Sequence, residues 1–320
     1  MKITSLLMSA ALALSMTANA ATTGYPQKPV TVIVPYTEGS ATDVIARMVS
    51  GKLSEMWGQP VNVMNVAGAG GSTGAGKAAK SAADGYTLLV HSNSFAVNLA
   101  AYAKPPYSLK DFTDIAPLGS QPYSLVVTPN TEINSVADLI ASAKANPGQM
   151  KFGSAGTGSS THLVAENFKS KAGIDTVHVP YKGGPEANAA TSSGEVTYWF
   201  PPSSIAIKGA KDGKFKVVAV TSASRFGPFP DVPTLSESGL KGFDVNGWWG
   251  LWAPAGIPAQ AKTKLVKDVA QALASADLRE KLISKGFEPM SMTPAQFSKL
   301  IKKEQDNAAK TLKAAGISPK

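Results

Sequence analysis

The sequence contains no cysteine among its 320 residues. This absence excludes disulfide bonds, thiolate metal ligands, iron–sulfur clusters, a cysteine nucleophile and a lipidated N-terminal cysteine. Charged residues are also scarce, at 17% of the chain, whereas about 25% is usual, so a coiled coil or a long solvated helix is not expected. Apolar residues make up 43% of the chain, which is enough for a hydrophobic core. The length predicts about two domains.

The N-terminus has the pattern of a secretory signal peptide. Lys2 provides a positive charge, a short apolar run follows it, and Ala18-Asn19-Ala20 matches the A-x-A cleavage site. The apolar run is shorter than the ~20 residues that a membrane span requires. We therefore predict that residues 1–20 are a signal peptide cleaved after Ala20, and that the mature protein is exported to the periplasm.

The formal net charge of +9 does not come from a concentrated basic region. The densest group, Lys299, Lys302 and Lys303, is followed by the acidic residues Glu304 and Asp306. Because no basic stripe is interleaved with aromatic residues, we predict no nucleic-acid partner. A positive balance attracts anionic ligands, but it serves solubility equally well.

Short β-branched runs alternate with helical patterns along the chain, which predicts an α/β fold with mostly parallel sheets flanked by helices. Val30–Pro35 reads as a buried strand, and Thr42–Trp57 has the apolar periodicity of a helix. Thr293-Pro294-Ala295-Gln296 is a capping box that starts a helix over Pro294–Ala315. Further strands are predicted at Val61–Val66, Tyr86–Val90, Ser124–Val127, Met150–Gly153, Thr176–Val179, Val196–Phe200, Val217–Thr221 and Trp248–Ala253.

A polar loop, Tyr36–Thr42, lies between the first predicted strand and its helix. In a parallel sheet such a loop lies at the carboxyl edge, where ligands bind. Thr37, Ser40 and Thr42 offer hydroxyl groups, and a helix N-terminus attracts carboxylates. The alternative is an ordinary helix cap, with Thr42 as the N-cap and Asp43 in the first turn.

A second strand–loop–helix junction, Gly153–His162, combines glycines, hydroxyl side chains and a helix N-terminus, which makes it the richest anion-binding candidate in the chain. The competing interpretation is a serine hydrolase that uses Ser159, Ser160 and His162. The G-x-S-x-G nucleophile motif is absent here, so we predict ligand binding rather than catalysis.

Other segments carry weaker signals. Gly68–Gly74 has the spacing G-x-G-x-x-x-G, which differs from a dinucleotide loop and predicts a tight turn. Tyr181 precedes a Gly-Gly turn and could wall a pocket, and Ser92 and Asn93 follow a strand. The histidines share no metal-ligand spacing, so no metal and no cofactor is predicted. Trp248, Trp249 and Trp252 are attributed mainly to core packing.

Several motifs occur together in a fixed order. They are Tyr25–Val30, Val34–Arg47, Gly68–Gly74, Asp84–Leu89, Gly156–Leu163, Pro180–Gly183 and Asp231–Gly239. This set, which spans nearly the whole mature chain, resembles the Bug family, the substrate-binding proteins of tripartite tricarboxylate transporters.

The resemblance implies a two-lobe periplasmic binding protein of a type II-like fold without catalytic activity. Each lobe would be an α/β unit, and two crossing strands would join lobe 1 (residues 21–123 and 248–320) to lobe 2 (residues 124–247). The implied ligand is a small organic carboxylate held between the lobes, and the implied partner is a membrane permease. We also expect a monomer.

Carried over to this sequence, the resemblance places ligand contacts on four segments. The candidate residues are Tyr36, Thr37, Glu38, Gly39, Ser40, Ala41, Thr42, Ser92, Asn93, Ser154, Ala155, Gly156, Thr157, Gly158, Ser159, Tyr181, Gly183 and Gly184. The first loop and the second lobe would hold opposite ends of the ligand, and closure of the lobes would be a hinge motion.

Two positions depart from the family pattern. Glu38 lies where the family usually has Pro-Gly-Gly, and it either points to solvent or receives an ammonium or hydroxyl group of a ligand. Tyr198 and Trp199 stand near a position that is often acidic, and they favour an aromatic or bulkier ligand. An amino acid, an aromatic carboxylate and a sensor-linked receptor role therefore remain alternatives.

Overall fold

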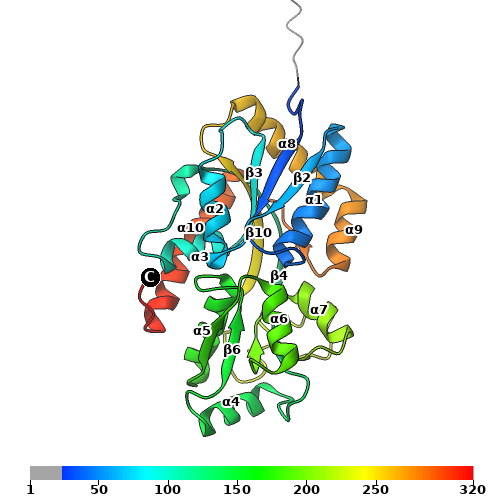
Figure 1. Ribbon diagram of the computed structural model, residues 1–320. Coiled ribbons are helices and arrows are strands. Elements are labelled where there is room, and N and C mark those ends of the chain that lie inside the picture. The colour runs from blue at the N-terminus through cyan, green and yellow to red at the C-terminus, as the bar shows by residue number, and fades with distance from the viewer. Residues whose placement is uncertain (1–23, 320) are drawn as a thin grey trace, which may run out of the picture.

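The computed structural model describes residues 24–319, and the predicted signal peptide, residues 1–20, lies outside them. Two lobes are visible in Figure 1, one above the other, each with a central sheet flanked by helices. The two-lobe α/β fold expected from the sequence is confirmed.

The first lobe, the upper one in Figure 1, is built on a six-stranded sheet. Its strands are β1 (Val30–Val34), β2 (Val61–Asn65), β3 (Thr87–Ser92), β4 (Phe112–Pro122), β10 (Asn246–Pro254) and β11 (Glu288–Pro289). The strand order is β11-β4-β10-β3-β1-β2. Its helices are α1 (Ala41–Trp57), α2 (Ser72–Ala79), α3 (Ser94–Ala101), α8 (Ala259–Ala274), α9 (Ala276–Ser284) and α10 (Pro294–Ala314), with two 3₁₀ turns, Ala69–Gly71 and Leu109–Asp111.

The second lobe is built on a five-stranded sheet with the order β7-β6-β8-β5-β9. These strands are β5 (Ser124–Val127), β6 (Lys151–Ser154), β7 (Val177–Pro180), β8 (Tyr198–Trp199) and β9 (Lys216–Val220). Its helices are α4 (Val136–Ala145), α5 (Ser160–Ala172), α6 (Gly184–Ser193) and α7 (Ser203–Lys211).

Both sheets are mixed rather than mostly parallel. β1 pairs in parallel with β2 and β3, whereas β10 runs antiparallel to β3 and β4. In the second lobe β6 is parallel to β7 and β8, and β5 is antiparallel to β8 and β9. The reason is topological: a chain that leaves the first lobe and later returns to it must cross in opposite directions, so the crossing strands lie antiparallel.

The two crossings lie side by side. β4 continues through Tyr123 into β5, and β10 brings the chain back, with Asn246 opposite Pro122. Gly247 is required there, because a Cβ at this position would lie 2.7 Å from the Tyr123 hydroxyl oxygen. The long strand β4 was not predicted from the sequence.

Each sheet is covered on both faces, so each lobe has its own apolar core. In the first lobe one core cluster includes Ile45, Leu88 and Leu265, and a second, on the other face, includes Phe95 and Phe297. The second lobe has a large cluster around Phe152 and Phe168 and a smaller one around Trp199 and Phe215. Hydrophobic burial on this scale is the main force that holds each lobe together.

Candidate functional site

A small cavity lies between the lobes and is lined by residues of both. The lining residues are Tyr36, Ser40, Ala41, Thr42, Ser92, Ser94, Ala155, Ser159, Ser160, Thr161, Gly184, Trp199, Pro202, Ile205 and Trp249. Among these residues none carries a charge, and seven carry a hydroxyl group on a serine or threonine. The walls come from the carboxyl ends of β1 and β3 in the first lobe and from the loops after β6 and β8 in the second.

The N-terminus of α1 forms one wall of the cavity. Ser40, rather than the Thr42 of the helix-cap alternative, is the N-cap: its Oγ accepts a hydrogen bond from the Asp43 N–H at 3.2 Å. The helix therefore begins at Ala41, and the backbone N–H groups of Ala41 and Thr42 have no acceptor within residues 24–319. They are available to an anion, as the first N–H groups of a helix generally are.

The loop before α1 is held in place by Asp43. Its carboxylate accepts hydrogen bonds from the Gly39 N–H at 3.0 Å, from Arg47 Nε at 2.9 Å and from Asn65 Nδ2 at 2.9 Å. Burial opposes ionisation, but these hydrogen bonds and the charge of Arg47 outweigh it and lower the pKa of Asp43. Because Arg47 balances the charge, Asp43 does not cancel the attraction of the helix terminus for anions.

The N-terminus of α5 forms the opposite wall, in the second lobe. Ser159 is its N-cap and accepts a hydrogen bond from the His162 N–H at 3.2 Å. Thr161 Oγ1 accepts from the Ala155 N–H at 2.9 Å, which fixes the loop after β6. The backbone N–H of Thr161 has no acceptor within the described residues. Two helix termini from different lobes thus approach one cavity.

A short chain of serine hydroxyls joins the lobes across the cavity wall. Ser92 Oγ donates to Ser94 Oγ at 3.0 Å, and Ser94 Oγ donates to Ser160 Oγ at 3.1 Å. The Ser160 N–H also donates to Ser94 Oγ, at 2.8 Å. The predicted contact Ser92 is therefore at the cavity, together with Ser94, which the sequence analysis missed because α3 was not predicted.

The rest of the cavity wall is aromatic or aliphatic. Trp249 donates its indole N–H to Thr42 Oγ1 at 2.9 Å, and Tyr36 donates its hydroxyl to the Gly70 carbonyl at 2.9 Å. Burial raises the pKa of Tyr36 to about 12, so this side chain stays neutral. Trp199 and Ile205, from the second lobe, also line the cavity.

The structure places eight of the predicted contacts at the cavity. These are Tyr36, Ser40, Ala41, Thr42, Ser92, Ala155, Ser159 and Gly184. The sequence analysis did not predict Ser94, Thr161, Pro202, Ile205 and Trp249 as contacts, and it named Ser160 in the serine-hydrolase interpretation and Trp199 as favouring a bulkier ligand without listing them as contacts. Ser160 and Thr161 belong to the loop that was singled out, so the cap pattern could have found them. Trp249 could not be found in this way, because only the return of β10 beside β3 brings it to the cavity.

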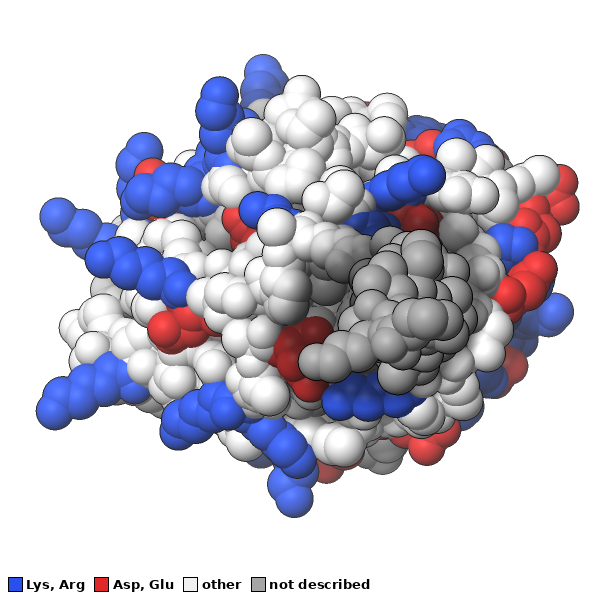
Figure 2. Space-filling model, turned by 90° about the horizontal axis from the view of Figure 1, so that it is seen from above, with Lys and Arg blue, Asp and Glu red and all other residues white. Residues whose placement is uncertain are grey.

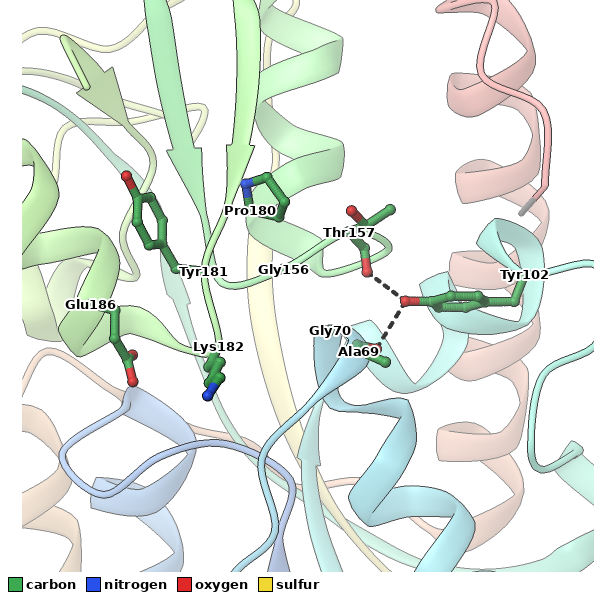
Figure 3. Close-up of a pocket in the computed structure, with 9 residues that line it drawn as sticks. All are labelled: Ala69, Gly70, Tyr102, Gly156, Thr157, Pro180, Tyr181, Lys182 and Glu186. Carbon is green, nitrogen blue, oxygen red and sulfur yellow. Dashed lines mark hydrogen bonds between the residues drawn. The ribbon is translucent and has the colours of Figure 1, made fainter. Parts of the chain in front are cut away.

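Three other predicted residues, Gly156, Thr157 and Tyr181, line an open pocket at the outer edge of the contact between the lobes (Figure 3). Tyr102 bridges the lobes there: its hydroxyl lies 3.0 Å from the Ala69 carbonyl oxygen and 2.9 Å from that of Thr157. This pocket has a volume of about 690 Å³ and opens widely to solvent.

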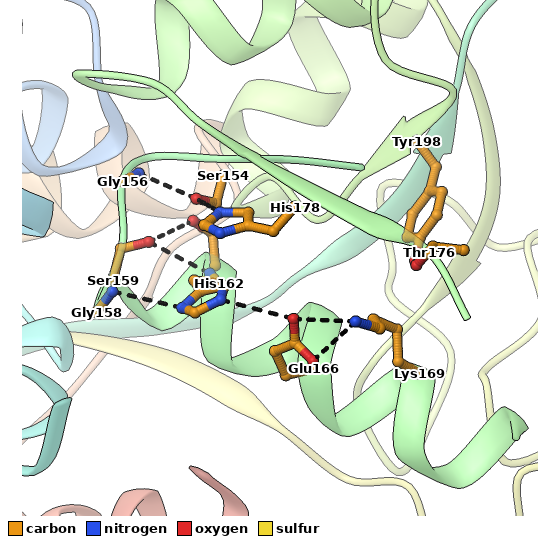
Figure 4. A network of polar contacts seen from close by, with 11 residues as sticks. Ser154, Gly156, Gly158, Ser159, His162, Glu166, Lys169, Thr176, His178 and Tyr198 are labelled. Atoms are coloured by element: carbon orange, nitrogen blue, oxygen red, sulfur yellow. Dashed lines mark hydrogen bonds and ion pairs between the residues drawn. The ribbon is translucent and has the colours of Figure 1, made fainter. Parts of the chain in front are cut away.

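The polar network behind α5 contains Ser154, whose Oγ lies 2.6 Å from His178 Nε2 (Figure 4). Neither residue lines the cavity. His162 stacks on His178 with ring centroids 4.0 Å apart, and its Nε2 lies 3.6 Å from Glu166 Oε1. The Ser159 hydroxyl caps α5 by accepting from the His162 backbone N–H. Ser159 and His162 therefore do not form the exposed pair of hydroxyl and imidazole that a serine hydrolase would need.

The remaining predicted residues contact neighbouring segments of the protein. Gly158 accepts a hydrogen bond from Asn98, and Asn93 donates to Glu304. Glu38 is exposed and forms an ion pair with Arg47 at 3.5 Å, outside the cavity. This position gives no support to the interpretation that Glu38 receives an ammonium group of a ligand.

Thr37 and Gly183 meet where the first loop touches the second lobe. Thr37 Oγ1 donates to Glu186 Oε2 at 3.4 Å, and a Cβ added at Gly183 would overlap Thr37 Oγ1. Gly39 packs close to Pro185 on the same seam. These predicted contacts therefore touch the opposite lobe rather than the cavity.

Surface charge and composition add three observations. On the face shown in Figure 2, Lys and Arg are scattered, with Asp and Glu between them. None of the helices in residues 24–319 has the length and apolar character that a membrane span requires. Within the same residues no group of three or more His, Asp or Glu side chains is placed to hold a metal ion.

Two α/β lobes, two crossing strands and a cavity closed by helix termini define the class of two-lobe solute-binding proteins. Residues 45–317 match the family described as "Tripartite tricarboxylate transporter family receptor". The chain belongs to this family, as the resemblance predicted, and it is a solute-binding protein.

Individual relatives agree with this assignment. Protein BugT of Bordetella pertussis is 35% identical over 299 residues, which cover 92% of each chain. The structure of the periplasmic binding protein BugD is similar, with a TM-score of 0.88, 30% identity and coverage of 92% of this chain and 100% of that one. The R. palustris protein Rpa4515 with adipate gives a TM-score of 0.90 and 32% identity, with coverage of 92% and 100%.

Proposed function

We propose that this protein captures a small organic carboxylate in the cavity between its lobes and delivers it to a membrane permease. The observation that carries this proposal is the convergence of two helix N-termini, from α1 and α5, on one cavity without any charged lining side chain. Each helix terminus is equivalent to about half a positive charge, so two of them can offset most of one carboxylate charge.

The hydroxyl groups at the cavity strengthen this proposal. Ser40 already accepts a hydrogen bond from its own helix, so its hydroxyl hydrogen is free to be donated. Ser159 accepts from its helix in the same way, and its Oγ also lies 2.9 Å from Thr161 Oγ1, so this pair has one hydroxyl hydrogen left to donate. The free N–H groups of Ala41, Thr42 and Thr161 are also donors. A site that offers mainly donors fits a group that only accepts, and an ionised carboxylate is such a group.

The family and its relatives supply the remaining support. A protein of the same fold was solved with adipate, a carboxylate, and family membership supports a permease as the partner. We also propose export to the periplasm with cleavage after Ala20, a monomeric state, and lobes that comprise residues 21–123 with 248–320 and residues 124–247.

The test is a thermal-shift screen of the mature chain with mono-, di- and tricarboxylates, using the matching neutral amides as controls. A ligand at a hundredfold excess over its Kd adds about 2.7 kcal/mol to the free energy of unfolding, which raises the midpoint by several degrees. We expect at least one carboxylate to do so and its amide not to. If the amides stabilise the protein as well as the acids, or if no acid has an effect, the proposal is wrong.

A further inference from the structure

We propose that the ligand carries a single carboxylate and that the other end of its body is uncharged, with a hydrogen-bond acceptor for the indole N–H of Trp199. This inference rests on the proposed function and narrows its ligand class. It assigns to Trp199 the role of a specificity-determining residue.

The first argument is the distribution of charge around the cavity. The donors that suit a carboxylate belong to the two helix termini, whereas Trp199, Pro202 and Ile205, which also line the cavity, carry neither a charge nor a hydroxyl group. No lining residue is cationic. A second ionised carboxylate beside these three residues would be buried without a compensating charge, which is strongly unfavourable.

The second argument is the unsatisfied donor on Trp199. The side chain lies on the cavity wall and has no exposed surface, and Nε1 has no hydrogen-bond partner within the described residues. The other cavity-wall indole, of Trp249, is satisfied by Thr42. A buried N–H without an acceptor costs free energy, so a ligand that brings a carbonyl or ether oxygen gains affinity by accepting this hydrogen bond.

The third argument is the rigidity of the indole. Trp199 packs in a core cluster with Val126, Ala206 and Phe215. On the cavity side a Cβ added to Gly184 would lie 3.6 Å from its Cη2 atom. Because these contacts hold the ring in one position, its N–H cannot turn to another acceptor, and a donor held in this way can select among ligands.

Three acids with five-carbon chains test the proposal, because they differ mainly at the end away from one carboxylate. These are 4-oxopentanoate, with a neutral acceptor, pentanoate, with none, and glutarate, with a second carboxylate. Calorimetric titration of the wild-type protein should give the tightest binding for 4-oxopentanoate, about fivefold or more over pentanoate. Glutarate should bind more weakly than 4-oxopentanoate.

The variant Trp199→Phe keeps an aromatic ring and removes the N–H. We expect it to bind 4-oxopentanoate and pentanoate about equally, so that the preference of the wild type is lost. Trp252→Phe is the matched control, because Trp252 is equally buried but does not line the cavity. This control should keep the preference of the wild type.

Two results would overturn the inference. One is glutarate binding at least as tightly as 4-oxopentanoate, and the other is Trp199→Phe lowering the affinity for both monocarboxylates by the same factor. A failure of the proposed function is different, since none of the carboxylates in the thermal-shift screen would then stabilise the protein.

Discussion

His91 lies on β3, fully buried between two aromatic rings. It makes edge-to-face contacts with Tyr36 and Phe95, at centroid distances of 5.6 Å and 6.0 Å. Neither ring nitrogen forms a well-aligned hydrogen bond within the described residues. Burial lowers the pKa of His91 to about 3, so the folded protein keeps this side chain neutral.

This burial predicts a dependence of stability on pH. In the unfolded chain His91 takes up a proton near pH 6.5, whereas in the folded protein it does so only near pH 3. Between these values the unfolded state binds more protons, so stability falls as the pH falls. The contribution of His91 to this slope is at most about 1.4 kcal/mol per pH unit.

The substitution His91→Phe should remove that contribution. Urea unfolding at about pH 7 and about pH 4 should show a smaller loss of stability in the variant than in the wild type. The absolute stability of the variant does not decide the matter, because the tight packing of this side chain against Gly71 can make the larger phenylalanine ring costly at every pH. Parallel pH dependences in the two proteins would contradict the prediction.

At the scale of elements, the loop before α1 and the start of α6 must come very close for the lobes to close. Gly183 has an extended backbone with φ of −176°, so alanine is conformationally acceptable there. Its Cβ, however, would overlap Thr37 Oγ1. We therefore predict that Gly183→Ala keeps the lobes apart and weakens binding of the best carboxylate ligand by about tenfold.

A double variant separates this contact from a general loss of stability. Thr37→Ala removes the atom that the new methyl group would meet, so Gly183→Ala combined with Thr37→Ala should recover most of the affinity, as measured by calorimetric titration. A double variant that binds as weakly as Gly183→Ala would show that the contact between these two elements does not control closure.

At the scale of the whole molecule, α3 holds the two lobes together at the edge of the cavity. Ser94 and Asn98 lie one turn apart on the same side of α3, and Tyr102 follows directly after the last helical residue, Ala101. Asn98 donates to the Gly158 carbonyl at 2.8 Å and Tyr102 to the Thr157 carbonyl at 2.9 Å, both in the second lobe. Both hydrogen bonds link the first lobe directly to the second and need no ligand. They therefore favour the closed arrangement of the lobes before any ligand binds.

Removal of one such bond should shift the balance toward an open form. A neutral hydrogen bond contributes about 1 kcal/mol, which corresponds to about a fivefold change in the open–closed equilibrium. We predict that Tyr102→Phe increases the radius of gyration of the ligand-free protein in small-angle X-ray scattering. The apparent affinity for ligand should fall by up to the same factor.

Tyr107→Phe is the matched control for this experiment. The Tyr107 hydroxyl donates to the Phe95 carbonyl at 2.7 Å, entirely within the first lobe. Its loss should lower the free energy of unfolding and leave the radius of gyration unchanged. Equal scattering curves for Tyr102→Phe and the wild type would argue against a role of α3 in closure.

The sequence by itself determined most of the elements and the loops that hold the two helix termini, although β4 and α3 were not predicted. Most predicted strands lie within one or two residues of the observed ones, because period-two and period-3.6 patterns arise from local geometry. The helix-cap alternative named Thr42, whereas Ser40 is the cap of α1, since several hydroxyl residues occur close together and only the backbone conformation decides which one caps the helix. The α5 terminus at Ser159 was within the predicted loop.

Only the tertiary structure decided which residues meet at the cavity. Trp249 reaches the cavity because β10 returns beside β3. Trp199 reaches it from β8 of the second lobe. Neither position can be derived from local periodicity. Ser154 and Glu38 belong to the predicted loops, yet one side chain turns inward to His178 and the other outward to Arg47. A sequence pattern specifies where a loop occurs, whereas long-range packing determines which of its side chains point into the shared space.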